Sequence, residues 1–206
     1  MSHDHRHDHD HEPVTDGNES PAAARVRALE ELLVARGLVE RDEIRRRIDW
    51  LVSRTPADGA RLVARAWVDE GFKQRLLANA REAALELDLD PGPSPVVVAL
   101  ENTEKVHHMV ACTLCSCYPK ALLGPPPDWY KSLAYRSRAV ADPRGVLREF
   151  GVELDDDVEL RVVDSTADVR YLVVPTRPPG TESLNEDELA GIVTRDAMIG
   201  VARPVA

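Results

Sequence analysis

The chain has 206 residues and a formal net charge of −10, and 43% of its residues are hydrophobic. This length and composition predict one packed domain with an extension. The acidic charge excludes nucleic acid as an expected partner, because phosphate binding needs a basic surface. No apolar stretch approaches the ~20 residues of a membrane span, and the histidine-rich start differs from a secretory signal peptide. We therefore expect a soluble, cytoplasmic protein that has no membrane partner.

Residues 1–20 are predicted to be a disordered tail. Five histidines stand at alternate positions among aspartates and an arginine, namely His3, His5, His7, His9 and His11. A segment of this composition cannot bury a hydrophobic core. Two interpretations remain open, a solvated polar tail or a weak metal-collecting segment.

Residues 21–90 are predicted to form a helical arm. Leucines and isoleucines recur at helical spacing over residues 21–52, with a stop at Gly37. Further helices are predicted over residues 58–70 and 71–87. Aromatic residues make up only 4% of the chain, so the core of this arm would be thin. We expect a partner subunit to cover its apolar stripes.

Prolines between residues 91 and 95 mark a boundary, and residues 91–206 are predicted to be the catalytic, metal-binding domain. Strands are predicted over residues 96–100, 107–111, 158–163 and 169–174, with a hairpin turn at 164–167 between the last two. Short helices are expected after residue 128, over 143–150 and over 186–196, where Asn185 and Glu188 resemble a capping box. The predicted fold class is therefore α+β, an N-terminal helical arm followed by a layered α/β domain with mostly antiparallel strands.

The three cysteines, Cys112, Cys115 and Cys117, lie within six residues. This clustering argues against a disulfide framework, and in a reducing compartment it predicts a metal site. A structural zinc site is one interpretation, with His107 or His108 as the fourth ligand. Iron–sulfur ligation is disfavoured because a fourth cysteine is missing.

A second interpretation is a claw that wraps one small ion. The three sulfurs and the backbone nitrogens of Ser116 and Cys117 would supply five donors from six residues. One coordination position would stay open, as catalysis requires. Metal-bound thiolates and amidates need a strongly polarising ion, which points to trivalent cobalt or iron.

The segment from Val110 to Pro119 (VACTLCSCYP) resembles the signature of nitrile hydratase alpha subunits. The likeness extends over roughly residues 25–202. It includes these further segments in order: 64–69 (ARAWVD), 101–103 (ENT), 123–124 (LG), 126–132 (PPDWYKS), 135–138 (YRSR), 143–147 (PRGVL), 164–167 (DSTA), 170–173 (RYLV), 177–178 (RP), 180–182 (GTE) and 194–201 (TRDAMIGV). The sequence is thus similar to this family along most of its length.

The resemblance implies a site and an activity. Cys112, Cys115, Ser116 and Cys117 would hold the metal, and Cys115 and Cys117 would be catalytic, oxidised to sulfinate and sulfenate respectively. Thr113 stands where cobalt members carry threonine and iron members carry serine. This implies non-corrin cobalt(III), with iron(III) as the alternative. The reaction would be hydration of a small nitrile substrate to its amide.

The resemblance also implies partners. A beta-type subunit would be needed for activity, and a metallochaperone or activator would act during maturation. Two other functions stay open. One is the gamma subunit of thiocyanate hydrolase, which carries the same claw, and the other is a non-catalytic metal-binding protein.

The sequence departs from the family after Pro119. The family commonly continues with Trp-Pro, whereas this chain has Lys120 and Ala121. Losing a rigid indole would widen the substrate pocket, because a lysine stem can extend to water. Tyr118 and Lys120 are therefore predicted to line a pocket for a bulky or heteroaromatic nitrile, with packing as the alternative role for Tyr118.

Overall fold

The computed structural model describes residues 20–115 and 117–205. The predicted tail, apart from Ser20, and the predicted ligand Ser116 therefore lie outside the described residues. The chain divides into two compact units, Met1–Arg47 and Ile48–Ala206. The division falls well before the predicted boundary at residue 90.

The two N-terminal helices follow the sequence pattern closely. Helix α1 (Pro21–Ala35) starts at the N-cap Ser20, whose side chain accepts a hydrogen bond from the amide of Ala23, and it has proline in its first turn. Gly37, with φ of 66°, lies between α1 and α2 (Arg41–Ser53). This confirms the predicted helical stop. Neither helix contains a buried residue.

In the second unit, α2 is followed by α3 (Ala57–Val68), α4 (Glu70–Ala78) and α5 (Ala80–Glu86). The single helix predicted over residues 71–87 is interrupted at Asn79. The backbone of this residue is extended, and its side chain caps α5 by accepting from the amides of Arg81 and Glu82. Helices α4 and α5 pack on β1, and α3 contacts β4. This part of the predicted arm is therefore covered by its own chain.

Four strands form two separate pairs: β1 (Val96–Glu101) with β4 (Val169–Val174), and β2 (Val106–Ala111) with β3 (Glu159–Asp164). Both pairs are parallel, so the prediction of mostly antiparallel strands is wrong. The predicted hairpin between β3 and β4 is also wrong, because these two strands belong to different pairs.

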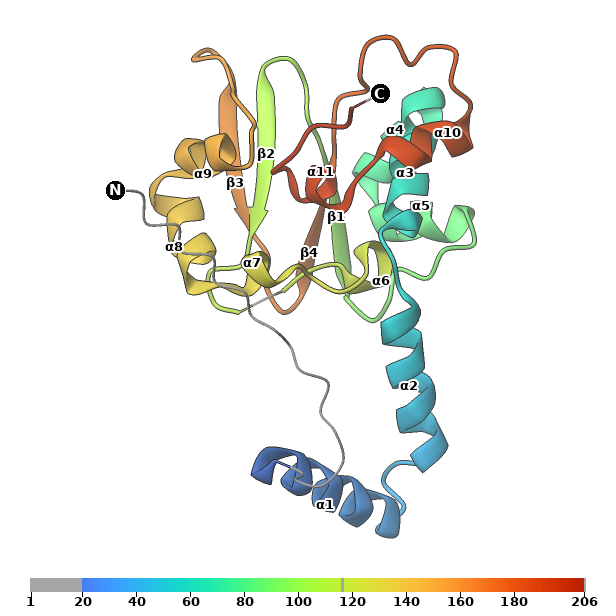
Figure 1. Cartoon of the computed structure of the whole chain (residues 1–206). Coiled ribbons are helices and arrows are strands. Elements are labelled where there is room, and N and C mark those ends of the chain that lie inside the picture. Colours follow the sequence, from blue (N-terminus) through green and yellow to red (C-terminus); the bar gives the residue numbers. More distant parts are fainter. Residues whose placement is uncertain (1–19, 116, 206) are drawn as a thin grey trace, which may run out of the picture. The chain divides into compact units, whose positions relative to one another are not determined.

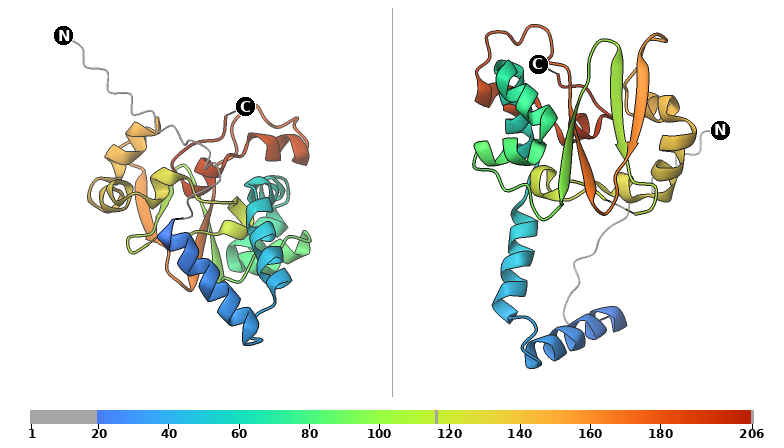
Figure 2. Two further views of the ribbon diagram at one scale, coloured as in Figure 1. Left: turned by 60° about the horizontal axis from the view of Figure 1, so that its bottom comes forward. Right: turned by 180° about the vertical axis from the view of Figure 1, so that it is seen from behind.

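The error has a physical reason. Figure 2 shows the chain reversing direction in the short connections 102–105 and 165–168, as a hairpin would. Alternating hydrophobicity identifies a strand and its buried face, but it carries no information on which strand is the hydrogen-bonding partner. Consecutive strands here run in opposite directions, and each pairs with a strand that is distant in the sequence.

The remaining helices flank these pairs. In Figures 1 and 2, α8 (Leu133–Ala141) and α9 (Pro143–Glu149) lie on the β3 side, and α10 (Glu186–Ile192) lies beside α3 on the other side. The capping box of Asn185 and Glu188 is confirmed. Helix α11 (Arg195–Ile199) packs on β4 and β2. Among the described residues, no helix is long and apolar enough to cross a bilayer.

Candidate metal centre

The cysteine loop begins at the carboxyl end of the β2–β3 pair. Ala111 is the last residue of β2, and its register partner Asp164 is the last residue of β3. The amide of Ser165 donates to the Ala111 carbonyl at 2.8 Å, which continues the pairing by one step. Cys112 follows Ala111 directly, so the pair gives the loop a fixed starting point.

Asp164 holds the second residue of the loop. Its carboxylate accepts from the amide of Thr113 at 2.9 Å and from the Thr113 hydroxyl at 2.5 Å. Hydrogen bonds to a charged acceptor are stronger than neutral ones. From the sequence, Asp164 is predicted only as part of a turn, without this role. Parallel pairing of β2 with β3 would have revealed it, because that pairing brings residues 111 and 164 together.

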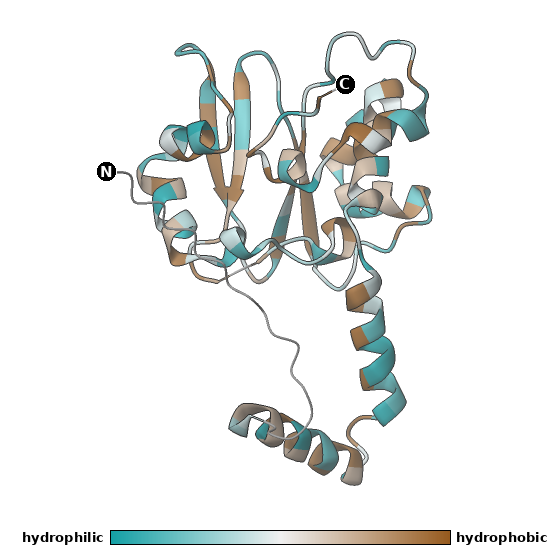
Figure 3. Ribbon diagram, viewed as in Figure 1, coloured by the Kyte–Doolittle hydropathy of each residue, from teal (hydrophilic) through white to brown (hydrophobic). Residues whose placement is uncertain are grey.

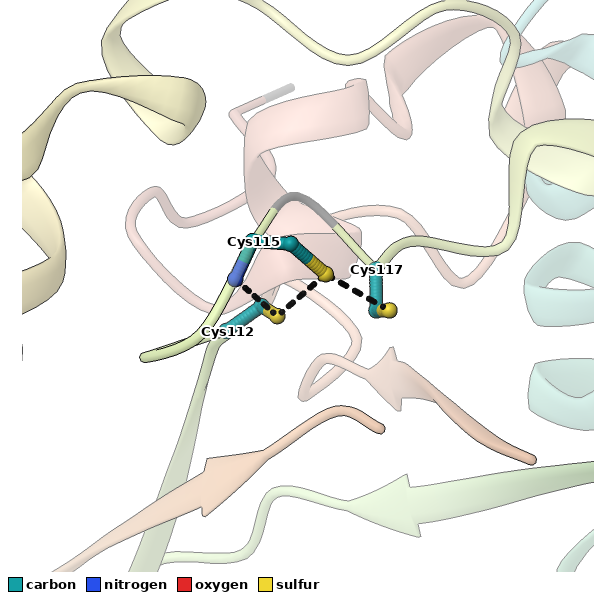
Figure 4. Close-up of side chains that lie close together, drawn as sticks. All are labelled: Cys112, Cys115 and Cys117. Carbon is teal, nitrogen blue, oxygen red and sulfur yellow. Dashed lines mark hydrogen bonds between the residues drawn. The ribbon is translucent and has the colours of Figure 1, made fainter. Parts of the chain in front are cut away.

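The three sulfurs converge (Figure 4). The Sγ atoms of Cys112 and Cys115 are 3.4 Å apart, and those of Cys115 and Cys117 are 3.1 Å apart. None of these three cysteines is in a disulfide, and their sulfur atoms lie within 4.8 Å of one another. The amide of Cys115 also donates to the Cys112 sulfur at 3.3 Å. Local backbone geometry thus brings the three sulfurs together.

Burial differs along the loop. Cys112 is fully buried, Cys117 is half-buried and Cys115 is exposed. Burial, followed by the hydrogen bond with Cys115, raises the pKa of Cys117 to about 12, and the charge of Arg170 acts in the opposite direction. A cation that binds the claw must therefore displace a firmly held proton.

An aromatic cluster supports the loop from the protein interior. The hydroxyl of Tyr130 donates to the Cys117 carbonyl at 2.9 Å, and that of Tyr135 donates to the Val110 carbonyl at 2.7 Å. The Tyr130 and Tyr135 rings lie 5.7 Å apart, and Tyr135 packs edge-on against Trp129 at 4.8 Å. Both ends of the loop are therefore tied to one rigid cluster.

The two predicted pocket residues differ in their surroundings. Tyr118 is buried, its ring lies 5.3 Å from that of Tyr130, and burial raises the pKa of its hydroxyl. Lys120 is exposed at the start of α6 (Lys120–Leu123), a helix that the sequence analysis did not predict. Tyr118 thus packs within the fold, while Lys120 is open to solvent.

His107 and His108 do not join the cysteines. His107 is buried, with Nε2 2.8 Å from the Gly200 carbonyl oxygen and Nδ1 3.2 Å from the Asn102 amide. His108 is also buried, and its Nδ1 lies 3.2 Å from Asn102 Oδ1. Within residues 20–115 and 117–205, the group with metal-ligand spacing consists of the three cysteines alone. Neither His107 nor His108 therefore supplies the fourth ligand of a zinc site.

A cavity of about 380 Å³ lies away from the claw, at the carboxyl ends of β1 and β4. Its lining includes Asn102, His107 and Arg177, and no cysteine. The claw itself is a surface feature, because Leu114 at its tip is 87% exposed.

Comparison with known proteins decides the family. Residues 20–202 match the family model described as nitrile hydratase, alpha chain. The chain belongs to the nitrile hydratase alpha-chain family.

The chain is 54% identical to the low-molecular weight cobalt-containing nitrile hydratase subunit alpha of Rhodococcus rhodochrous, over 88% of each chain. It is 41% identical to the thiocyanate hydrolase subunit gamma of Thiobacillus thioparus, over 86% of this chain and 77% of that one. Among solved structures, a double mutant of the Fe-type nitrile hydratase from Comamonas testosteroni Ni1 matches with a TM-score of 0.81. That match has 41% identity over 90% of this chain and 92% of the other. The expected family and its relation to thiocyanate hydrolase are thus confirmed.

Proposed function

We propose that this chain is the metal-carrying subunit of a cobalt nitrile hydratase, which adds water to a nitrile to give the amide. The observation that carries the proposal is the convergence of three cysteine sulfurs, none of them in a disulfide, within 4.8 Å on one short loop. When bound, trivalent cobalt would act as a Lewis acid that polarises the nitrile or activates water.

The residues of the loop fit such an ion. Three sulfurs on a short loop, together with the backbone nitrogens of Ser116 and Cys117, make a donor set with an open position. Cobalt is favoured over iron because the cobalt-containing relative from Rhodococcus rhodochrous shares 54% identity, whereas the Fe-type structure shares 41%. Thr113, the residue expected for cobalt, is fixed by Asp164. Iron is the alternative.

We assign separate roles to the cysteines. Cys112, buried and nearest to β2, anchors the ion from the protein side. Cys115 and Cys117 are exposed and half-buried, so oxidation to sulfinate and sulfenate is sterically open to them. Oxygens on these sulfurs would withdraw charge from the ion. The Cys117 sulfenate oxygen would act as nucleophile or as general base toward water.

The surface of the chain favours an obligate partner. Water has free access to Leu114 and Cys115, whereas catalysis of this kind works best in a site that excludes water. Helices α1 and α2 also expose large apolar side chains, among them Val26, Leu29 and Ile48. A beta-type subunit that covers these surfaces would complete the site, and a metallochaperone or activator would load the ion.

The substrate is proposed to be bulky or polar, such as a heteroaromatic nitrile. Lys120 is exposed three residues beyond Cys117, and its flexible stem would leave room that a rigid indole at this position would fill. The matching test compares kcat/KM for a heteroaromatic nitrile and for acrylonitrile in the wild type and in Lys120→Trp. The tryptophan ring should lower kcat/KM for the heteroaromatic nitrile selectively. An equal decrease for both substrates would refute this assignment.

Thiocyanate hydrolase is the second candidate, because its gamma subunit shares 41% identity with this chain. The test uses the complex of the full chain with its co-expressed partner, loaded with cobalt and assayed on nitriles and on thiocyanate. Amide formation without carbonyl sulfide supports the nitrile hydratase. Carbonyl sulfide and ammonia from thiocyanate support the hydrolase. Activity on neither substrate by a cobalt-loaded complex would favour a non-catalytic metal-binding protein.

A further inference from the structure

Ser165 carries a buried hydroxyl that has no hydrogen-bond partner within residues 20–115 and 117–205. Only 2% of this residue is exposed. The buried hydroxyl of Thr181, by contrast, donates to the Pro178 carbonyl at 2.7 Å and accepts from Arg177 at 3.1 Å. An unpaired buried hydroxyl costs free energy, so native proteins keep few of them, and those that persist are often close to bound ions or reacting groups.

Backbone hydrogen bonds hold Ser165 beside the first cysteine of the claw. The Ser165 amide donates at 2.8 Å to the carbonyl of Ala111, the residue before Cys112. The residue after Cys112 is Thr113, whose amide donates to the Asp164 carboxylate at 2.9 Å. Residues on both sides of Cys112 are therefore bonded to residues 164 and 165.

Burial places the two side chains on the same side of the backbone. Side chains alternate between the two faces along an extended segment. Asp164 is exposed and Ser165 is buried, and Cys112 is fully buried. The hydroxyl of Ser165 and the sulfur of Cys112 are therefore both on the interior side of the claw.

Tyr130 is a second hydroxyl near this position. Burial raises the pKa of the Tyr130 hydroxyl, and Cys112 adds to the rise whereas Ser165 opposes it. The Tyr130 proton is donated to the Cys117 carbonyl at 2.9 Å, and no hydrogen bond joins the two hydroxyls. Tyr130 therefore supports the far end of the claw, and the proton of Ser165 remains available to another acceptor.

A metal ion changes what Cys112 can accept. A thiol sulfur is a weak acceptor, whereas sulfur that ligates a metal is a thiolate and carries negative charge. Hydrogen bonds to a charged acceptor are roughly twice as strong as neutral ones. The Cys112 sulfur accepts from the Cys115 amide at 3.3 Å, and a thiolate has lone pairs for a further donor. Ser165 is the neighbour with a proton to give.

We propose that the Ser165 hydroxyl donates a hydrogen bond to the Cys112 sulfur when the claw holds its ion. Ser165 is then a positioning residue, which orients the buried ligand and withdraws charge from its sulfur. Hydrogen bonds to ligating sulfur tune the electronic properties of metal centres. The inference rests on the proposed metal-carrying function, and it concerns the buried cysteine rather than the two that are proposed to be oxidised.

Three variants of the full chain, each in complex with its co-expressed partner, test this role. Ser165→Ala removes the hydroxyl. Ser165→Thr and Ser165→Val form a matched pair of nearly equal size, of which only threonine keeps the hydroxyl. All three keep the backbone amide that donates to Ala111. The probe is cobalt(II), added to the metal-free complex in oxygen-free buffer so that the cysteines stay unmodified.

Ser165→Ala should bind cobalt(II) about 10–100-fold more weakly than wild type in competition with a chelator. Its sulfur-to-cobalt charge-transfer absorption should move to longer wavelength, because sulfur without the hydrogen bond gives up an electron more easily. Ser165→Thr should lie closer to wild type than Ser165→Val in both measurements. Without metal, Ser165→Ala should melt at the wild-type temperature or above it, since it removes an unpaired buried hydroxyl.

Several results would overturn the proposal. Equal cobalt affinity and equal spectra for wild type and Ser165→Ala would show that the hydroxyl does not reach the claw. Equal behaviour of the threonine and valine variants, or a lower melting temperature of metal-free Ser165→Ala, would show a packing role. If Ser165→Ala has no effect in a Tyr130→Phe background, Ser165 acts through that tyrosine rather than on Cys112.

The same experiment separates this inference from the proposed function. If the wild-type complex binds no cobalt(II), the metal-carrying role is wrong, and the role of Ser165 is wrong with it. If cobalt binds but no nitrile is hydrated, only the proposed activity is wrong. The affinities and spectra involve no nitrile, so they decide the role of Ser165 in either case.

Discussion

Helices α1 and α3 both contain apolar residues but differ in what covers them. Each carries apolar residues at helical spacing, and both fall in the segment expected to be one arm. In α3, six residues are buried, including Leu62 and Val63, whereas α1 buries none. Figure 3 shows hydrophobic bands recurring also along the exposed α2. Exposed apolar spacing in a helix therefore predicts that another surface covers it. It does not predict whether that surface belongs to the same chain.

The largest expected effect tests this difference directly. Leu62→Ala empties a fully buried position in α3 and should lower the free energy of unfolding by ~2–5 kcal/mol. The matched change in α1, Leu29→Ala, alters a side chain that is 56% exposed. It should change the free energy of unfolding by no more than ~0.5 kcal/mol. Denaturant titration of both full-length variants measures the contrast.

Leu29→Ala should instead weaken binding of the partner subunit, which titration calorimetry would detect. A large loss of intrinsic stability in Leu29→Ala would show that α1 is covered by its own chain. The proposed difference, that only α3 is covered by its own chain, would then be wrong.

A second contrast lies within the loop, between its anchored start and its exposed tip. Asp164→Asn keeps the size of the side chain but removes the charge that holds Thr113. Loss of such an outer partner typically lowers metal affinity by ~10–100-fold. Asp168→Asn, in the connection that follows Asp164, is the control. Cobalt retention during competition with a chelator is measured for both variants and the wild type. Equal retention by Asp164→Asn and the wild type would mean that Asp164 does not position the claw.

The smallest effect concerns the aromatic support. Tyr130→Phe removes the hydroxyl that donates to the Cys117 carbonyl at 2.9 Å but keeps the ring. The loss should be ~1 kcal/mol of folding free energy, with a measurable shift in the absorption of the cobalt-loaded claw. Tyr118→Phe is the control, because its hydroxyl bonds to the Leu123 carbonyl at 3.4 Å, outside the loop. Identical spectra for all three proteins would contradict support of the claw by Tyr130.

Local signals in the sequence predicted the elements well. The four strands, the stop at Gly37 and the capping box at Asn185 depend on neighbouring residues, and the structure confirms each. The three cysteines were equally predictable, because six residues of backbone bring their sulfurs together. Such features need no knowledge of the rest of the chain.

Long-range pairing was not predictable in the same way. The partner of β2 lies about fifty residues away, so the choice of β3 depends on how helices and strands pack in three dimensions. The anchor from Asp164 to Thr113 was missed for the same reason. The hydroxyl of Tyr130 likewise reaches the Cys117 carbonyl only through the packing of α7 (Asp128–Lys131). The cysteines of the claw could be predicted from the sequence, whereas the supporting contacts from Asp164 and Tyr130 could not.

We propose that the claw of this chain, covered by a partner, is the centre that hydrates nitriles. The most direct measurement is elemental analysis with mass spectrometry of the active complex, beside the same complex carrying Cys117→Ser. We expect cobalt bound in proportion to this chain, two oxygens added to Cys115 and one to Cys117, and loss of nitrile hydration in the variant. Full activity in complexes that contain only iron, or that carry unmodified thiols, would contradict it.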